Sequence, residues 1–587
     1  MQKHGDTPLK DHLLHTLHMI QQRERCITDE SIHRIAAQYS LPVSQVRAVV
    51  AFYAFFQTEP CGDYHLFFSN CPACGYEQAG QNLLQMLAHK LNVQIGQTRP
   101  DGRISLHETS CIGMCDHGAS LLVNGQPLTG LESASIERLA NQIETAAPLH
   151  NWPQDWMHTD SAVHKTNLLL EDSFVPGAGL RATLARGAEA TLESITHSGL
   201  RGRGGAGFAT GRKWRLCKAA AGDARYVVCN ADEGEPGTFK DRWLLQQQAE
   251  RVLEGMAICA FIIGARQGFL YLRGEYRYLL PHLQTTLAQQ RRQGLLGKNI
   301  GGEPGFEFDV DIVIGAGAYI CGEESALIES LEGKPGIPRN RPPFPVTQGY
   351  LGQPTVVNNV ETFWAAASII VNGADWFKSV GTPESSGSKL LSISGDCTAP
   401  GIYEYPFGIT VHQILRECGA MNTQAVQIGG PAGTLIGRAD FQRKIGFEDL
   451  STGGSFMVFG ETRDMMTVVQ NFTKFFAHES CGFCTPCRVG TTLLKHNLEK
   501  IATGHGTHLD IQTLRETSNL VQRYAHCGLG HTAANPILNS LQSFPEIFEQ
   551  RLAARSFTPN FDLDAALSEA RRLTRRDDSK AHLDSGY

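Results

Sequence analysis

Apolar residues recur at helical spacing near the start of the chain and again near its end. Residues 8–56 show this pattern, interrupted at Pro42, and predict a group of helices. Residues 464–555 show the same periodicity around a set of cysteines and predict a second helical region. Between these regions, short apolar runs alternate with helical stretches. The overall pattern therefore predicts an α/β multidomain chain with helical ends.

Residues 63–146 alternate between strand-like and helix-like patterns, with cysteines in two of the loops. The order is strand, helix, two strands and a closing helix, which predicts a thioredoxin-like domain. We expect N-terminal helices plus this domain over residues 1–148. The polar stretch 149–164 that follows reads as a linker.

Residues 165–386 combine apolar runs that end in small or acidic residues with helices between them. Such alternation predicts a largely parallel sheet covered by helices. Residues 387–462 carry short strands, turns and one helix, which predicts a β-grasp-like module. A helical domain is expected at 463–556, and the charged stretch 557–587 reads as a C-terminal tail.

Bulk composition narrows the class of protein. The 587 residues are 42% hydrophobic and 19% charged, which is typical of globular domains. A net charge of −7 argues against a nucleic-acid partner. No apolar run reaches the ~18 residues of a membrane span, and the N-terminus lacks the apolar core of a signal peptide. We therefore expect a cytoplasmic protein.

Sixteen cysteines in such a chain do not suggest a disulfide framework. Eight of them fall into two groups with the spacing of metal ligands. The first group is Cys71, Cys74, Cys111 and Cys115, and the second is Cys481, Cys484, Cys487 and Cys527. The other eight are scattered, and small buried side chains explain them best.

One loop has the spacing of a dinucleotide-binding fingerprint, G-x-G-x-x-G, at Gly202, Gly204 and Gly207. The preceding residues are polar and helix-like, whereas a Rossmann loop follows an apolar strand. Glycines still allow backbone N–H groups to approach a phosphate closely. Arg203 and Lys213 supply charge to neutralise it. The alternative is a glycine-rich surface loop.

Three further blocks combine carboxylates or amides with glycine turns, and they suit a metal, ribose hydroxyls or the edge of a flavin. The absence of histidine within them makes a transition-metal site less expected. Their candidate residues are Asp232, Glu233 and Glu235; Gly322, Glu323 and Glu324; and Phe344, Asn358, Asn359 and Thr362.

Together these blocks resemble the flavin- and NADH-binding subunit of respiratory complex I over residues 165–555, and residues 1–150 resemble its small thioredoxin-like subunit. The resemblance implies FMN and NAD(H) as cofactors in an atypical Rossmann-like fold. The flavin phosphate or ring would contact Gly202, Arg203, Gly204, Gly205 and Lys213. The ribityl chain and ring would contact Asn230, Asp232, Glu233, Asn358, Asn359 and Thr362.

The same resemblance places NADH between aromatic and acidic residues. Phe208 and Phe344 would stack on it, while Glu235 and Glu324 would bind its ribose or amide and position the hydride. Hydride transfer to a flavin needs orientation and water exclusion more than acid–base help, so no general acid or base is expected. The family often has Lys where Arg341 stands and an aromatic residue near Leu216.

The second cysteine group has the spacing C-x2-C-x2-C at Cys481, Cys484 and Cys487, with Cys527 as a remote fourth thiol. This arrangement suits a [4Fe–4S] cluster, and the alternative is a zinc knuckle. The family resemblance includes Pro486 and Arg488. At position 526, where relatives often have Ser, the chain has His526, whose hydrogen bond or charge would tune the potential.

The first cysteine group is less regular. Cys111 and Cys115 match the C-x3-C pair of the family, whose other pair is usually C-x4-C. Here that pair would be Ser69 and Cys74, with Cys71 as the available thiol. We expect a [2Fe–2S] cluster on Cys71, Cys74, Cys111 and Cys115. Ligation by Ser69, zinc and a vestigial site remain the alternatives.

The fusion of both parts in one chain resembles the diaphorase large subunit of the soluble NAD-reducing [NiFe] hydrogenase. It implies exchange of a hydride between NAD(H) and FMN, with single electrons passing through the clusters to or from partner subunits. The complex would catalyse H2 + NAD+ = NADH + H+. Alternatives are the matching subunit of an NAD-dependent formate dehydrogenase or of complex I. A hypothesis of another class is a non-catalytic nucleotide-binding iron–sulfur module.

Overall fold

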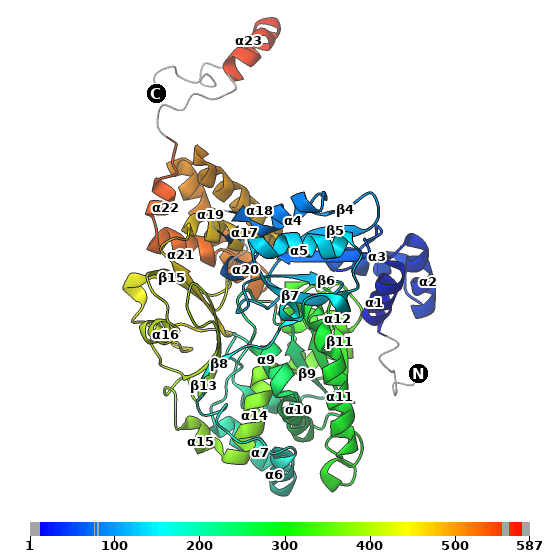
Figure 1. Ribbon diagram of the computed structural model, residues 1–587. Helices are drawn as coiled ribbons and strands as arrows, with labels where there is room; N and C mark the ends of the chain where they lie inside the picture. The colour runs from blue at the N-terminus through cyan, green and yellow to red at the C-terminus, as the bar shows by residue number, and fades with distance from the viewer. Residues whose placement is uncertain (1–11, 75–76, 79–80, 554–562, 578–587) are drawn as a thin grey trace.

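The computed structural model describes residues 12–74, 77–78, 81–553 and 563–577. Figure 1 shows the blue and cyan N-terminal elements above the green central part, with the brown and orange helices beside them. The N-terminal and C-terminal parts of the chain meet directly, because the Asn471 side-chain amide donates to Asn70 O over 2.9 Å.

Three helices open the described chain, as the periodicity of residues 8–56 predicts. They are α1 (Leu13–Glu24), α2 (Asp29–Tyr39) and α3 (Val43–Phe52). The Thr28 side chain caps α2, and Pro42 stands just before α3, where its missing N–H costs nothing. Tyr53 then donates a hydrogen bond of 2.7 Å to Ser330 Oγ, which ties these helices to the central domain.

The thioredoxin-like prediction is confirmed by a five-stranded sheet of order β4-β5-β1-β6-β7. Strand β1 runs parallel to β5 and antiparallel to β6. Leu66 and Phe68 alternate inward along β1 and are fully buried. The strands are β1 (Tyr64–Ser69), β4 (Gln97–Thr98), β5 (Ile104–Thr109), β6 (Ala119–Val123) and β7 (Gln126–Leu131), and the helices are α4 (Leu83–Lys90) and α5 (Ser133–Glu144). A short pair, β2 (Glu77–Gln78) and β3 (Gln81–Asn82), precedes α4.

The polar stretch 149–164 is more than a tether. It contains two short 3-10 helices, η3 (Leu149–Asn151) and η4 (Gln154–Met157). Trp152 and Trp156 are buried against the thioredoxin-like core, and Trp152 stacks on Tyr64 with ring centroids 5.8 Å apart. Two large apolar rings thus anchor a segment whose other residues are mostly polar.

The central domain contains a four-stranded parallel sheet of order β11-β10-β9-β12. Helices α10 and α14 pack on each other; a side chain at Gly255 would lie 2.1 Å from Phe363 O, so only glycine permits this approach. The strands are β9 (Tyr226–Ala231), β10 (Gln267–Leu272), β11 (Asp309–Ile314) and β12 (Thr355–Asn359). The helices are α6 (Ala178–Arg186), α7 (Ala188–His197), α8 (Thr210–Ala219), α9 (Lys240–Gln247), α10 (Ala249–Ile263), α11 (Leu280–Arg292), α12 (Glu324–Leu331), α13 (Pro345–Gln348), α14 (Val360–Asn372) and α15 (Ala374–Lys378).

A six-stranded mixed sheet of order β16-β15-β17-β13-β14-β8 forms the β-grasp-like module. Its edge strand β8 comes from the predicted linker, because Ile402 pairs with Val163. The strands are β8 (Val163–Lys165), β13 (Ser388–Gly395), β14 (Gly401–Pro406), β15 (Thr423–Ile428), β16 (Thr434–Gly437) and β17 (Ser455–Gly460), and the helix is α16 (Val411–Glu417).

The C-terminal region is helical, as predicted. Its helices are α17 (Met465–Glu479), α18 (Thr485–Lys500), α19 (His508–Tyr524), α20 (Gly528–Thr532), α21 (Asn535–Ser543) and α22 (Glu546–Glu549). The predicted tail contains one further helix, α23 (Leu563–Thr574), and the rest of that tail lies largely outside the described residues. Among the helices described, none combines the length and apolar character needed to cross a bilayer.

Candidate functional site

The glycine-rich loop joins helix α7 to helix α8, so it follows a helix and differs from a Rossmann loop as expected. The loop closes on itself, because Gly202 N donates to Phe208 O and Thr210 N donates to Leu200 O, each over 2.9 Å. Gly205 has φ +114°, a conformation that glycine adopts without strain. The loop is therefore a rigid backbone arch.

This arch lies over the end of strand β12. A side chain at Gly204 would place its Cβ 3.2 Å from Asn359 Cβ, so the bare backbone keeps the space open. A second glycine segment, which the sequence motifs did not reveal, packs on the arch from the β-grasp-like module. A Cβ at Gly453 would lie 3.3 Å from Gly204 O, and Ser451 Oγ donates to Gly205 O over 3.3 Å. The glycine pair 453–454 just before strand β17 was the available signal.

Amide side chains gather at the carboxyl edge of the parallel sheet. Asn230 lies near the end of β9 and Asn358 near the end of the neighbouring β12, so both lie at the edge where ligands bind in open α/β sheets. Asn230 Nδ2 donates to Gly322 O over 2.8 Å, and its Oδ1 accepts from Asp232 N over 3.0 Å. The Trp214 indole holds Asn358 Oδ1 at 2.8 Å. These amides are therefore fixed before any ligand binds.

The two carboxylates after β9 differ in their partners. Asp232 is half-buried, and burial of its carboxyl group raises its pKa well above the usual value. One of its oxygens, Oδ2, has no hydrogen-bond partner among the described residues. Glu233 instead caps helix α9, accepting from Asp241 N over 2.8 Å and Arg242 N over 3.1 Å. The Asp232 carboxyl group is thus available to accept a hydrogen bond from a bound ligand, whereas the Glu233 carboxylate is occupied by hydrogen bonds within the protein.

Glu235 lies where the central domain meets the β-grasp-like module. It accepts a hydrogen bond from Ala432 N over 2.9 Å and another from the Tyr319 hydroxyl. Burial raises the pKa of Glu235 to about 7. The Glu235 carboxyl group therefore titrates near neutral pH.

The turn before helix α12 presents the other two acidic candidates. Glu323 caps the helix by accepting from Ser325 N over 2.9 Å, and it pairs with Arg341 at 3.1 Å. Glu324 pairs with Lys213 Nζ at 2.9 Å. This ion pair links α12 to the helix that follows the glycine-rich arch, so the predicted flavin and nucleotide contacts share one network.

Two aromatic rings stand exposed, as expected for stacking surfaces. Phe208 in the arch is 44% exposed and Phe344 is 51% exposed. Lys213 Nζ lies 5.9 Å from the Phe208 ring centroid. Phe344 and Arg341 line one cavity together with His526 from the C-terminal domain. Exposed rings beside fixed charges suit the binding of a planar, charged ligand.

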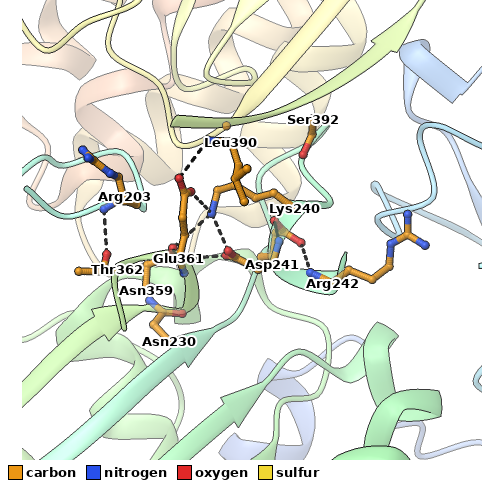
Figure 2. Close-up of polar contacts among 12 residues, drawn as sticks. Arg203, Asn230, Lys240, Asp241, Arg242, Asn359, Glu361, Thr362, Leu390 and Ser392 are labelled. Carbon is orange, nitrogen blue, oxygen red and sulfur yellow. Dashed lines mark hydrogen bonds and ion pairs between the residues drawn. The ribbon is translucent and has the colours of Figure 1, made fainter. Parts of the chain in front are cut away.

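The Arg203 side chain faces away from the amides, contrary to a direct role in flavin binding. Its guanidinium is buried over the ring of Phe407, 4.8 Å from the centroid, and donates to Ser386 O over 3.0 Å. Figure 2 shows it directed away from Asn230. Its backbone N–H donates to Thr362 Oγ1 over 2.9 Å, so Arg203 joins the site through its backbone and shapes the arch.

A buried ionic cluster lies beneath the arch, and no motif in the sequence pointed to it (Figure 2). Its members, which we call the ionic cluster, are Lys240, Asp241, Glu361 and Lys389. All four side chains are at most 3% exposed. Burial would raise the pKa of Glu361, but the cations of Lys389 and Lys240 outweigh burial and lower it.

The second cysteine group converges on one cavity. Cys481, Cys484, Cys487 and Cys527 line a space of about 260 Å³ together with His526 and apolar residues. Burial raises the pKa of Cys487 to about 11, so its thiol needs a metal to ionise at neutral pH. Four thiols around an apolar hollow fit a cubane cluster.

The first cysteine group is also brought together. The Sγ atoms of Cys71, Cys74 and Cys115 lie within 4.8 Å of one another. Cys111 Sγ lies 3.0 Å from Cys115 Sγ. The Ser69 hydroxyl is fully buried without a hydrogen-bond partner among the described residues. The thiol set suits two irons, and Cys71 lies together with Cys74 and Cys115 as a fourth ligand of this set would.

Three family models match the chain, one for each predicted cofactor region. The thioredoxin-like [2Fe-2S] ferredoxin model matches residues 2–144. The Nuo51 FMN-binding domain model matches residues 195–368. The NADH-ubiquinone oxidoreductase-F iron-sulfur binding region matches residues 467–551.

Curated relatives are similar over most of the chain. The alpha subunit of the NAD-reducing hydrogenase HoxS of Cupriavidus necator is 43% identical over 94% of each chain. The NADP-reducing hydrogenase subunit HndC of Solidesulfovibrio fructosivorans is 41% identical over 63% of this chain and 78% of its own. An NADH-quinone oxidoreductase subunit of Mycobacterium bovis is 42% identical over 62% of this chain and 85% of its own.

A solved structure is similar over nearly the whole fold. It is an NAD+-reducing [NiFe]-hydrogenase in the H2-reduced state, with a TM-score of 0.89 and 42% identity. The match covers 97% of this chain and 98% of that chain.

Proposed function

The chain belongs to the family of diaphorase subunits of NAD-reducing hydrogenases, relatives of the complex I flavin subunit, and we propose that it exchanges electrons between NAD(H) and partner subunits. It is an NAD-dependent flavin and iron–sulfur oxidoreductase that uses FMN, a [2Fe–2S] cluster and a [4Fe–4S] cluster. When bound, FMN accepts or gives a hydride and exchanges single electrons with the clusters.

The FMN site that we propose consists of the arch and the amide edge beneath it. Backbone N–H groups of the arch would hold the phosphate. Asn230, Asn359 and Thr362 would bind the ribityl chain and ring, with Asp232 as the acceptor of the remaining donors. The unpartnered Asp232 Oδ2 supports this assignment. Glu233 and Arg203 would act indirectly, through helix α9 and the shape of the arch.

The nucleotide would bind on the exposed side of the arch. Phe208 and Phe344 supply the stacking surfaces, and Glu235 and Glu324 would hold the ribose and amide. Since the Lys213–Glu324 pair joins both sites, it would set the approach of the nicotinamide to the flavin. These residues orient the reactants and exclude water, and none of them needs to act as a general acid or base.

The domain assignment follows from the two cysteine sites. We propose residues 1–148 as the unit that holds the [2Fe–2S] cluster and 463–556 as the unit that holds the [4Fe–4S] cluster. The central domain 165–386 and the module 387–462 would share the FMN site, because Ser451 and Gly453 of the module contact the arch.

The sixteen cysteines all lie within the described residues and none forms a disulfide, which supports a cytoplasmic location.

The partner that we propose is a hydrogenase module, reached through an iron–sulfur subunit, so that the complex catalyses H2 + NAD+ = NADH + H+. The similarity to HoxS alpha over 94% of each chain carries this choice. A formate dehydrogenase or a complex I-type assembly would need the same diaphorase. Copurification of the native complex followed by nickel and molybdenum analysis separates these assemblies: nickel supports the hydrogenase, and molybdenum overturns it.

The observation that carries the diaphorase function is the convergence of the arch, the amide edge and both cysteine sets in one chain. The test is anaerobic addition of NADH to the purified protein. We expect the flavin absorbance to bleach and a dye such as benzyl viologen to be reduced. A protein that binds NADH without either change would be a non-catalytic nucleotide-binding module instead.

A further inference from the structure

The ionic cluster beneath the arch is buried, yet it serves no role assigned above. Lys240 is its centre: Nζ lies 2.6 Å from Asp241 Oδ1 and 3.0 Å from Glu361 Oε2. Lys389 approaches the same Glu361 oxygen at 2.5 Å. Replacing a buried ion pair with apolar residues is often neutral or stabilising, so such a cluster is weak evidence for stability alone.

Lys240 also reaches the proposed flavin site. Its Nζ donates to Asn359 Oδ1 over 3.2 Å, and Glu361 N donates to the same oxygen over 3.0 Å. At the other end of the amide, Asn359 Nδ2 donates to Asp241 Oδ2 over 2.6 Å. Lys240 thus pairs with both carboxylates and fixes the orientation of the Asn359 amide (Figure 2). The Cβ of Asn359 lies next to Gly204 of the arch.

The two lysines of the cluster are not equivalent. Burial would lower the pKa of Lys240, but Asp241 and Glu361 outweigh it and raise the pKa above the usual value. Burial lowers the pKa of Lys389 to about 7, although the neighbouring Glu361 carboxylate partly offsets this effect. Lys240 is therefore a permanent cation at neutral pH, and it alone of the two contacts Asn359.

We propose that Lys240 is a positioning residue for the flavin: it locks Asn359 beneath the arch and supplies the fixed cation of the site. The inference rests on the proposed function, in which Asn359 and the arch hold FMN. A fixed cation beside a cofactor favours the more negative form of that cofactor, which for a flavin is the reduced form. Lys240 should therefore raise both the retention of FMN and its midpoint potential.

The experiment compares Lys240→Met with Lys389→Met in the purified complex. Both changes remove one buried amino group next to Glu361, but only the first removes the contact with Asn359. FMN release is followed by its fluorescence, and the midpoint potential by anaerobic spectroelectrochemistry. For Lys240→Met we expect FMN retention to fall about tenfold and binding to favour the oxidised form about tenfold more, a negative shift of about 30 mV for the two-electron couple. Lys389→Met should change both by less than about twofold.

A third variant guards against failure to fold, since leaving a buried carboxylate without its cation is strongly destabilising. Lys240→Gln keeps a donor for Asn359 and should show the same negative shift while retaining most of its FMN. An unchanged potential in every folded Lys240 variant would overturn the proposal, and so would equal shifts for Lys389→Met and Lys240→Met. A wild-type protein that holds no FMN would contradict the proposed function instead.

Discussion

The two cysteine sites use the same ligand chemistry but are built in different ways. The C-terminal site takes three thiols from one short segment, Cys481 to Cys487, and a fourth from the start of helix α20. The N-terminal site combines two loops, one after β1 and one between β5 and β6. Its four thiols are at most 3% exposed, whereas Cys481 and Cys484 are only half-buried.

The surroundings of the two sites differ as well. His526 joins the C-terminal site to residues 338–344, which carry the proposed stacking residue Phe344 and which we call the nucleotide loop. Its backbone N–H donates to Cys484 Sγ over 3.5 Å, and its ring bonds to Pro338 O at 3.2 Å. The N-terminal site is instead sealed by the central domain, since Arg273 donates to Cys111 O over 2.8 Å. A half-buried site beside the proposed nucleotide-binding residues suits electron transfer to a partner, and its local motif makes it recognisable in the sequence.

The comparison is tested most strongly by removing one ligand of the C-terminal site. Cys484→Ser should abolish the [4Fe–4S] signal in electron paramagnetic resonance and stop electron delivery to partner subunits. FMN should remain bound, because its proposed ligands belong to other elements. A full cubane signal in this variant would show that Cys484 is not a ligand.

The N-terminal site should depend on Cys71 rather than on Ser69. Cys71→Ala is expected to remove or broaden the [2Fe–2S] signal, since a Ser alkoxide is a poor ligand at neutral pH. Ser69→Ala removes an unpartnered hydroxyl, so the signal should persist and the free energy of unfolding should change by less than ~1 kcal/mol. Dye reduction by NADH should survive both changes. The reverse pattern would assign the ligand to Ser69.

The nucleotide beside the C-terminal site should be NAD(H) rather than NADP(H). The Glu324 carboxylate, together with the ionised fraction of Glu235, would repel the additional phosphate of NADPH. Glu324→Gln should lower kcat/KM for NADH by about 10- to 100-fold, as the loss of a charged hydrogen bond does, and narrow the preference over NADPH. Steady-state kinetics with both nucleotides tests this. Equal kcat/KM values in the wild type would contradict it.

The smallest effect is expected at His526, the link between cluster and nucleotide loop. His526→Ala removes the ring hydrogen bonds to Pro338 O and Arg339 O, so KM for NADH should rise about threefold, the worth of one net hydrogen bond. His526→Asn keeps a donor and should restore most of the affinity. His531→Ala is the control, because that ring bonds to Gln522 O instead. Equal KM values for His526→Ala and His531→Ala would refute the link.

Much of the fold was predictable because the strands and helices have clear periodicities. The apolar runs of β9 and β11 end before the acidic site residues that the sequence predicts. The linker was harder to interpret, since Trp152 and Trp156 are two apolar residues in a polar stretch and their burial depends on a distant core. The segment 451–454 was missed because its glycines matter only where they meet the arch.

The local chemistry can be read directly from short stretches of the sequence: the C-x2-C-x2-C spacing, the glycine-rich arch and the acidic turn before α12. Each of these motifs lies within a short stretch of sequence, where the local backbone geometry follows from neighbouring residues. Which polar groups became buried partners depended instead on the packing of distant elements. Lys240, Glu361 and Lys389 come from α9, α14 and β13, and their charges meet only after the sheet and module close over them. Desolvation depends on that packing, so no local pattern could reveal which lysine would contact Asn359.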